Sequence, residues 1–197
     1  MKKWTVPAII LGALLILALI FGGMYNGLVQ EREKVTKAFS DVKVQYQRRA
    51  DLIPNLVNTV KGSSNFEQET LTEVTEARAR ATSINVNADN PAQVQEYVAA
   101  QNQVSSSLGR LIATVEAYPE IKSTAAYQDL IVQLEGTENR IAVARGDFNE
   151  AARPYNARIQ TFPTNIFAGL FGFKAFEYFE AEAGSENAPT VDFNTSE

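Results

Sequence analysis

Two of the residue types that most often carry out chemistry in proteins, histidine and cysteine, are absent from this 197-residue chain. Their absence removes the commonest general base, all thiolate chemistry, nearly all zinc sites and the Glu-x-x-His pairs of di-iron helical bundles. The carboxylates Glu116, Glu135, Asp147 and Glu150 lack the spacing that metal binding or paired acid–base catalysis requires. We interpret them as a solvated helix face. We therefore expect a protein that is not an enzyme and binds no metal or cofactor.

One charged residue stands in an apolar helical seam. The seam alternates spacings of four and three residues, as in a coiled coil, and consists of Val35, Phe39, Val42, Tyr46, Arg49, Ile53, Leu56 and Val60. Pro54 is expected to kink this helix, because proline has no N–H for the carbonyl of Ala50. Gly62 is expected to end it. Ser64 and Glu67 have the spacing of a capping box that opens a second, shorter helix.

Counting residues along the helices predicts a polar layer around Arg49. Arg49 lies thirteen residues before Gly62, and a similar count from the start of the last long helix near Thr124 reaches Glu138. Arg78 falls at the same level, so Glu138 is predicted to pair with Arg49 or Arg78, roughly 20 Å from the distal tip. We interpret the layer as structural, because polar seam residues fix register in coiled coils. The alternative is a site for a small polar ligand or an ion.

An uncharged run of 21 residues, Trp4–Met24, follows Lys2 and Lys3. At about 1.5 Å per residue, a helix of this length spans roughly 30 Å, the thickness of a bilayer's hydrocarbon core. The alternative, a cleaved signal peptide, favours a shorter apolar core and a small-x-small cleavage site, which residues 21–24 lack. We therefore expect residues 4–24 to anchor the chain in the lipid bilayer. The two lysines favour a cytoplasmic N-terminus and an external domain, which is periplasmic in a bacterium with two membranes.

Residues 25–161 show helical periodicity in four stretches and no convincing strand alternation. The third stretch begins with Asn90 as N-cap and Pro91 at the first helical position, and Pro119 is expected to end it. The fourth begins near Thr124 and keeps an unbroken apolar repeat. Because the connections are only a few residues long, neighbouring helices are expected to be antiparallel. We predict an all-α fold, in which an N-terminal transmembrane helix (residues 1–24) precedes an antiparallel up-down four-helix bundle with long helices.

Residues 162–180 are rich in aromatic side chains. If the last long helix returns towards the membrane, this segment lies near the bilayer surface, where aromatic side chains favour the headgroup region. We predict a second membrane contact or a self-association surface formed by Phe167, Leu170, Phe171, Phe173, Phe176 and Phe179. The alternative is that these rings cap the open end of the bundle's core. Residues 181–197 are acidic, small and polar, and we expect them to be a disordered tail.

Several short segments between residues 24 and 180 occur together in a specific order. They are Tyr25–Val29, Gln47–Val57, Ala77-Arg78, Gln133–Ile141, Ala144-Arg145, Tyr155-Asn156, Phe162-Pro163 and Gly172-Phe173. In this set the chain resembles the LemA family. The resemblance implies a bacterial inner-membrane protein with an antiparallel helical domain, and it implies no established biochemical activity. One branch of the family resembles magnetosome proteins implicated in shaping membranes, and some relatives occur in settings with envelope proteases.

The chain is acidic, with 18 basic and 23 acidic residues and a net charge of −5. Nucleic-acid binding needs clustered lysine and arginine, so we expect no nucleic-acid partner. Our leading hypothesis is a non-catalytic, single-pass envelope scaffold or membrane-associated assembly factor that forms homo-oligomers or binds an envelope protein. The alternative is an adaptor or regulator of an envelope enzyme such as a protease. A third alternative is an enzyme that uses carboxylates alone.

Overall fold

The computed structural model describes residues 5–62 and 66–180, and within them it contains six α-helices and no strand. The helices are α1 (Thr5–Lys61), α2 (Gln68–Ser83), α3 (Pro91–Val115), α4 (Pro119–Lys122), α5 (Ala125–Gln160) and α6 (Thr164–Phe171). The prediction of an all-α fold is confirmed. The predicted acidic tail, residues 181–197, lies outside the described residues.

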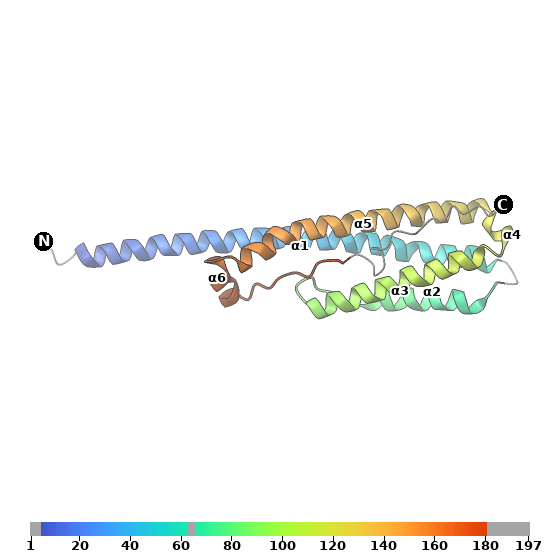
Figure 1. Cartoon of the computed structure of the whole chain (residues 1–197), viewed down its shortest axis with the longest axis horizontal. Helices are drawn as coiled ribbons and strands as arrows, with labels where there is room; N and C mark the ends of the chain where they lie inside the picture. Colours follow the sequence, from blue (N-terminus) through green and yellow to red (C-terminus); the bar gives the residue numbers. More distant parts are fainter. Residues whose placement is uncertain (1–4, 63–65, 181–197) are drawn as a thin grey trace, which may run out of the picture.

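The expected anchor and the first helix of the helical body form one continuous helix, α1. It has 57 residues and is therefore about 86 Å long at 1.5 Å per residue. Its N-terminal part extends beyond the other helices (Figure 1), and its most apolar stretch is not buried against the rest of the described chain. Within the described residues, α1 is the one helix long and apolar enough to cross a membrane. Pro54 lies inside α1, which continues past it to Lys61.

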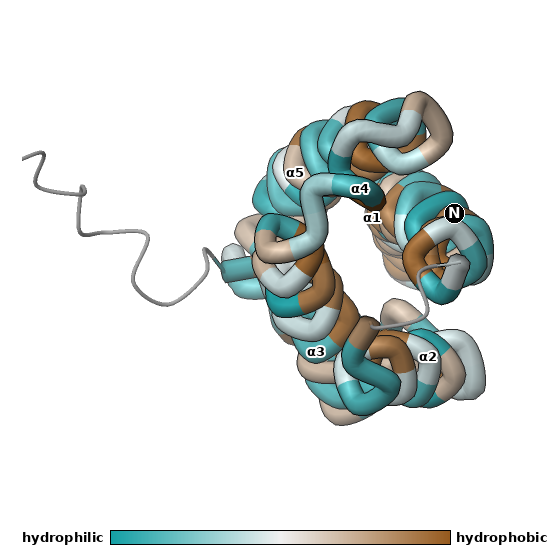
Figure 2. The backbone as a smooth tube through the Cα atoms, turned by 90° about the vertical axis from the view of Figure 1, so that its right-hand side faces the viewer, coloured by the Kyte–Doolittle hydropathy of each residue, from teal (hydrophilic) through white to brown (hydrophobic). Residues whose placement is uncertain are grey.

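The four longest helices lie side by side along the longest axis of the molecule (Figure 1). The sequence colours show that α1 leads away from the N-terminal end and that α5 returns beside it. In the view along the long axis, the helices follow one another in the order α1, α5, α3 and α2 (Figure 2). Accordingly, α1 packs against both α5 and α2, and α2 packs against α3.

The buried apolar side chains form two clusters along the helices. On α1, one cluster extends to Tyr46 and the other begins at Ile53. On α5, the division falls between Leu134 and Ile141. Arg49 is buried in the interval between the clusters, with 1% of its surface exposed. A polar residue therefore lies where the apolar core is interrupted.

Side-chain caps fix where two of the long helices begin. The side chain of Asn90 accepts a hydrogen bond from the backbone N–H of Gln93, and Thr124 Oγ1 accepts one from the backbone N–H of Tyr127. Such caps satisfy backbone donors that the first helical turn leaves free. These two predicted helix starts are confirmed. Pro119 follows the end of α3 by several residues and begins the short helix α4.

The second helix begins later than the sequence predicts. Glu67 is the N-cap residue of α2, and its side chain makes no capping hydrogen bond. A capping box requires this glutamate inside the helix, three residues after the cap, so that prediction is wrong. The carboxylate instead accepts a bond of 3.5 Å from Thr70 Oγ1. Packing of Phe66 on Tyr118, with ring centroids 5.0 Å apart, contributes to the entry into α2.

A tight turn after α6 sends the chain back along the helical body. Gly172 has φ +74°, the left-handed conformation that glycine adopts without steric cost, and the backbone N–H of Phe173 bonds to the carbonyl of Ala168 at 2.9 Å. Residues 173–180 then run without regular secondary structure beside the long helices (Figure 1). We call residues 173–180 the C-terminal strap.

Candidate functional site

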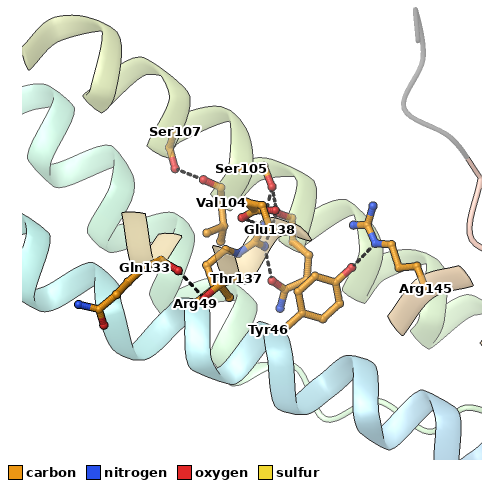
Figure 3. A network of polar contacts seen from close by, with 10 residues as sticks. Tyr46, Arg49, Val104, Ser105, Ser107, Gln133, Thr137, Glu138 and Arg145 are labelled. Atoms are coloured by element: carbon orange, nitrogen blue, oxygen red, sulfur yellow. Dashed lines mark hydrogen bonds and ion pairs between the residues drawn. The ribbon is translucent and has the colours of Figure 1, made fainter. Parts of the chain in front are cut away.

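Arg49 is the centre of a polar layer that joins α1, α3 and α5. Its Nη1 donates to Ser105 Oγ at 2.6 Å and to Glu138 Oε1 at 2.9 Å. Its Nη2 donates to the backbone carbonyl and the side-chain Oε1 of Gln101, at 2.9 and 2.6 Å. Figure 3 shows the guanidinium beside Ser105 and Glu138. Charge-assisted bonds of this number offset the cost of removing the guanidinium from water.

The structure brings Glu138 to Arg49 and gives Arg78 a different partner. Arg78 Nε donates to the backbone carbonyl of Ala50 at 2.7 Å. That carbonyl would normally accept from the residue four positions later, which is Pro54 and has no N–H. Arg78 therefore supplies from α2 the donor that the proline removes from α1. This bond compensates for a proline inside a continuous 57-residue helix.

The hydroxyl groups next to the layer are satisfied by their own helices. Thr137, which is fully buried, donates to the carbonyl of Gln133 at 2.7 Å, and Ser107 donates to the carbonyl of Val104 at 3.0 Å (Figure 3). Both hydroxyls are therefore engaged by backbone carbonyls of their own helices.

Tyr46 connects the polar layer to the C-terminal strap. Its hydroxyl accepts a bond of 2.8 Å from Arg145 Nε, while the guanidinium of Arg49 lies 5.2 Å from the ring centroid (Figure 3). The Arg145 guanidinium also lies 5.5 Å from the Phe179 ring. Burial raises the pKa of Tyr46, and Arg145 opposes this rise. Burial raises the pKa of the neighbouring Tyr97 to about 12.

Two asparagines of α5 hold the C-terminal strap by its backbone. Asn156 donates to the carbonyl of Phe176 at 2.8 Å and accepts from its N–H at 2.9 Å. Asn149 makes the same pair of bonds with Phe179, also at 2.8 and 2.9 Å. Seven helical residues rise about 10.5 Å, and three extended residues span about 10 Å, so the two spacings match. Each asparagine side-chain amide thereby makes the pair of hydrogen bonds that a residue of a neighbouring β-strand would make with the strap.

The predicted aromatic surface divides into buried and exposed parts. Phe176 and Phe179 are 3% and 9% exposed, so their assignment to a membrane or self-association surface is wrong. The asparagine bonds turn the strap so that these two rings pack on the core, where Phe148 lies 6.3 and 5.2 Å from them. Phe173 is half-buried against the same cluster and contacts Tyr25, with ring centroids 5.7 Å apart.

The remaining predicted surface residues lie on α6, beside the end of the apolar part of α1. The rings of Phe167 and Phe21 are 4.3 Å apart, and those of Phe171 and Tyr25 are 5.3 Å apart. Large apolar side chains of α6 are nevertheless exposed. The exposed residues of this surface, which we call the α6 face, are Ile166, Leu170 and Phe171.

Ion pairs fix the part of the helical body nearest to this face. Arg158 Nη1 lies 2.6 Å from Glu31 Oε1 and joins the end of α5 to α1. A Cβ at Gly27 would lie 2.6 Å from Arg158 Nη2, so the glycine leaves room for this arginine to cross α1. Arg32 of α1 pairs with Asp89 in the loop before α3.

The donor groups of a metal site are not assembled in the part of the chain that the structure describes. No three histidine, cysteine, aspartate or glutamate side chains gather there as metal ligands would. The contacts described above join the helices inside the body, and the α6 face exposes apolar side chains at one end. The sequence pattern pointed to Arg49, Glu138 and α6, but it gave no sign of the asparagine bonds, whose partners lie 20 and 30 residues away.

Among the described residues the chain is all-α, and one of its helices is long and apolar enough to cross a membrane. The chain matches the LemA family over residues 38–193 and belongs to that family. The resemblance found in the sequence is thus confirmed.

Curated relatives include proteins of two names. Protein LemA of Metamycoplasma hominis is 26% identical over 181 residues, which cover 90% of this chain and 77% of the relative. Magnetosome protein MamQ 2 of Paramagnetospirillum magneticum is 28% identical over 181 residues, covering 82% of this chain and 66% of the relative. Magnetosome protein MamQ of Magnetospirillum gryphiswaldense is 28% identical over 180 residues, with 81% and 66% covered. The chain therefore spans 66% of the length of these magnetosome relatives.

Proposed function

We propose that this chain is a non-catalytic, single-pass membrane protein that serves as a scaffold or assembly factor at the bilayer surface. In this proposal residues 4–24 cross the bilayer, and the rest of α1 forms an antiparallel four-helix bundle with α2, α3 and α5. Lys2 and Lys3 before the anchor favour a cytoplasmic N-terminus, which puts the bundle on the periplasmic or extracellular side of a bacterial inner membrane. Similarity to proteins named for the magnetosome supports work at a membrane.

The position of α6 carries this proposal. Phe21, which contacts Phe167, belongs to the uncharged stretch whose length matches a bilayer. Contact with it brings α6 to the level of the membrane interface. Leu170 and Phe171 are 76% and 55% exposed, and large apolar side chains at this level favour the boundary between headgroups and acyl chains. The α6 face therefore offers a second attachment to the membrane and a surface through which copies associate.

The interior supports a structural role for the helical body. A scaffold needs fixed helix positions, and the polar layer fixes the register of α1, α3 and α5 by bonds that an apolar core does not supply. The same bonds occupy the buried arginine, so it is a poor candidate for catalysis. The observations give no comparable support to the alternative of an enzyme adaptor.

In-cell photocrosslinking of the full-length protein tests this function. A photoreactive amino acid replaces Phe171 on the α6 face, and the matched control replaces Phe176, which belongs to the C-terminal strap and is buried in the core. We expect Phe171 to give adducts with lipid and ladders of self-linked protein, whereas Phe176 gives links within its own chain. A single heterologous protein adduct at Phe171 would favour the adaptor alternative. Links confined to the same chain at both positions would contradict the scaffold.

A further inference from the structure

A cavity of about 490 Å³ lies between α1, α2 and α3, on the side of the polar layer that faces away from Glu138. Its wall includes Tyr46 and Arg49 of α1, Arg78 of α2, and Tyr97 and Gln101 of α3. A volume of this size is in the range of small-molecule sites, roughly 300–1,000 Å³. The cavity is distinct from the α6 face, and the scaffold proposal makes no use of it.

The charge of the cavity wall is opposite to that of the chain. The chain has a net charge of −5, yet the charged residues in the wall are Lys43, Arg49 and Arg78, and no carboxylate lines it. Glu138 neutralises Arg49 from the α5 side. Among the described residues, no carboxylate lies within ion-pairing distance of Lys43 or Arg78. Two positive charges therefore remain uncompensated at one concave site.

The rest of the wall combines apolar and aromatic side chains with the polar side chains of Ser40, Gln47, Thr82 and Gln101. Val44, Ala81, Ile84 and Val104 contribute apolar surface, and Tyr97 contributes a ring. A ligand that fits this wall has an anionic group for the cations and an apolar body for the other side chains. Arginine and lysine both bind the oxygens of phosphates and of carboxylates. The wall therefore specifies an oxyanion as the charged group of the ligand, and either of these two would fit.

The height of the cavity above the membrane excludes a lipid headgroup. Lys43 and Arg49 lie 19 and 25 residues beyond Met24 on the same helix. At 1.5 Å per residue, the cavity is about 30–40 Å from the end of the anchor, farther than a headgroup of that bilayer reaches. The ligand must therefore come from solution.

From these observations we infer that the cavity binds a small soluble organic anion, a phosphate or carboxylate on an apolar body. Lys43 and Arg78 hold the oxyanion, and the rim of Tyr97 and the aliphatic side chains covers the apolar body. The Nε of Arg78 is already bonded to Ala50, which fixes the direction of the guanidinium before a ligand arrives.

Titration calorimetry of the full chain in nanodiscs of zwitterionic lipid tests the inference. Two probes have the same phenyl ring with different oxyanions: phenyl phosphate carries a phosphate and benzoate carries a carboxylate. The third probe, inorganic phosphate, lacks the ring. We expect saturable binding of at least one aromatic probe with a Kd below about 1 mM, and at least fivefold weaker binding of inorganic phosphate. The tighter of the two aromatic probes identifies the oxyanion. If neither binds saturably, the inference is wrong.

Matched variants separate the cavity from general charge effects. Lys43→Gln and Arg78→Gln should each weaken binding at least fivefold. Their controls are Lys37→Gln, on the same helix and paired with Asp41, and Arg80→Gln, on the same helix and bonded to Gln103 outside the cavity. Equal weakening in a variant and its control would overturn the inference. Because Arg78 also bonds to Ala50, the lysine pair decides the outcome if Arg78→Gln unfolds.

Discussion

Arg49 occupies a seam position between Tyr46 and Ile53, where a coiled coil would hold a hydrophobic residue. Burying a guanidinium is costly unless its donors are bonded and its charge is compensated. Here Gln101 and Ser105 accept from it and Glu138 supplies the opposite charge. Each of these partners can bond to Arg49 at only one register of the helices. The polar layer therefore selects one alignment, whereas the apolar clusters on either side tolerate several.

Glu138→Gln should lower the free energy of unfolding by about 1–2 kcal/mol, because it leaves the charge of Arg49 without a counter-charge. The loss is smaller than for a fully enclosed pair, since Glu138 is 46% exposed. Chemical denaturation of the full chain in detergent measures it. Glu135→Gln, an exposed carboxylate on the same helix, is the control and should change stability little. Equal effects in both variants would show that the pair does not stabilise the fold.

Arg78→Ala should cost about 1–3 kcal/mol, because the buried carbonyl of Ala50 then has no donor. In a Pro54→Ala background the new backbone N–H can bond that carbonyl, so the same substitution should cost markedly less. The double-mutant cycle gives the coupling energy directly. Arg80→Ala provides the surface control. Additive effects of the two substitutions would rule out the compensation of the proline by Arg78.

Stability should fall in alkaline solution because of buried tyrosines. The pKa of Tyr97 is raised to about 12 from 10.0 by burial, so between these values the unfolded chain has lost the proton that the folded chain still binds. The free energy of unfolding therefore decreases as the pH rises from about 10 to 12. Tyr97→Phe should make this decrease less steep in denaturation curves measured at several pH values. Tyr178→Phe, at an exposed tyrosine, should not, and equal slopes in both variants would contradict the assignment.

At the scale of elements, the C-terminal strap contributes two of its aromatic side chains to the buried core. Asn149 and Asn156 bond the backbone of Phe179 and Phe176, and the rings then fill the cluster around Phe148. These bonds satisfy backbone groups of a segment that has no regular secondary structure of its own. The strap thus depends on two side chains of α5 rather than on a ladder of backbone bonds.

Asn156→Ala should detach the middle of the strap, because Phe176 loses both backbone partners in a buried position. We expect a loss of about 2–3 kcal/mol in stability and much faster hydrogen exchange of the Phe176 amide. Hydrogen exchange with mass spectrometry resolves residues 173–180 from the helices. Asn139→Ala, at an exposed site on α5, is the control. Unchanged exchange in the Asn156 variant would mean that ring packing alone holds the strap.

The sequence predicts the helices well, because their signals are local. Asn90 and Thr124 are caps that act within one turn, and heptad spacing identifies the buried face of α1. Counting along ideal helices also put Arg49 and Glu138 at one level, and these side chains lie 2.9 Å apart. The count could not choose between Arg49 and Arg78 as the partner, since that depends on how the helices are rotated.

Contacts between distant segments could not be predicted in the same way. The strap is aromatic like α6, and composition alone does not distinguish a ring buried by two asparagine bonds from a ring left exposed. The capping box failed for a related reason, because tertiary packing of Phe66 on Tyr118 accompanies a later start of α2. Local pattern thus determined the elements, and long-range geometry determined which apolar residues remained free.

At the scale of the whole molecule, the apolar N-terminal stretch and the first helix of the helical body belong to one continuous helix, α1. In the proposed topology about 37 residues of α1 follow the anchor, which would extend the body roughly 55 Å from the bilayer. α6 lies at the near end of this body, and the inferred anion cavity lies about halfway along it. A second attachment through α6 would restrict the tilt of the long helix, which suits a protein that organises others at a membrane.

The depth of α6 is the most direct test of the account. The chain has no cysteine, so Leu170→Cys and Val132→Cys each accept one environment-sensitive dye in full-length protein reconstituted in vesicles. Both sites are highly exposed, and Val132 lies about 40 Å farther from the membrane along α5. We expect dye at Leu170 to emit as in an apolar medium and to be quenched by brominated lipid, while dye at Val132 reports water. If the dye at Leu170 instead emits as in water and is not quenched, as expected for the dye at Val132, then α6 does not touch the bilayer and the central claim is wrong.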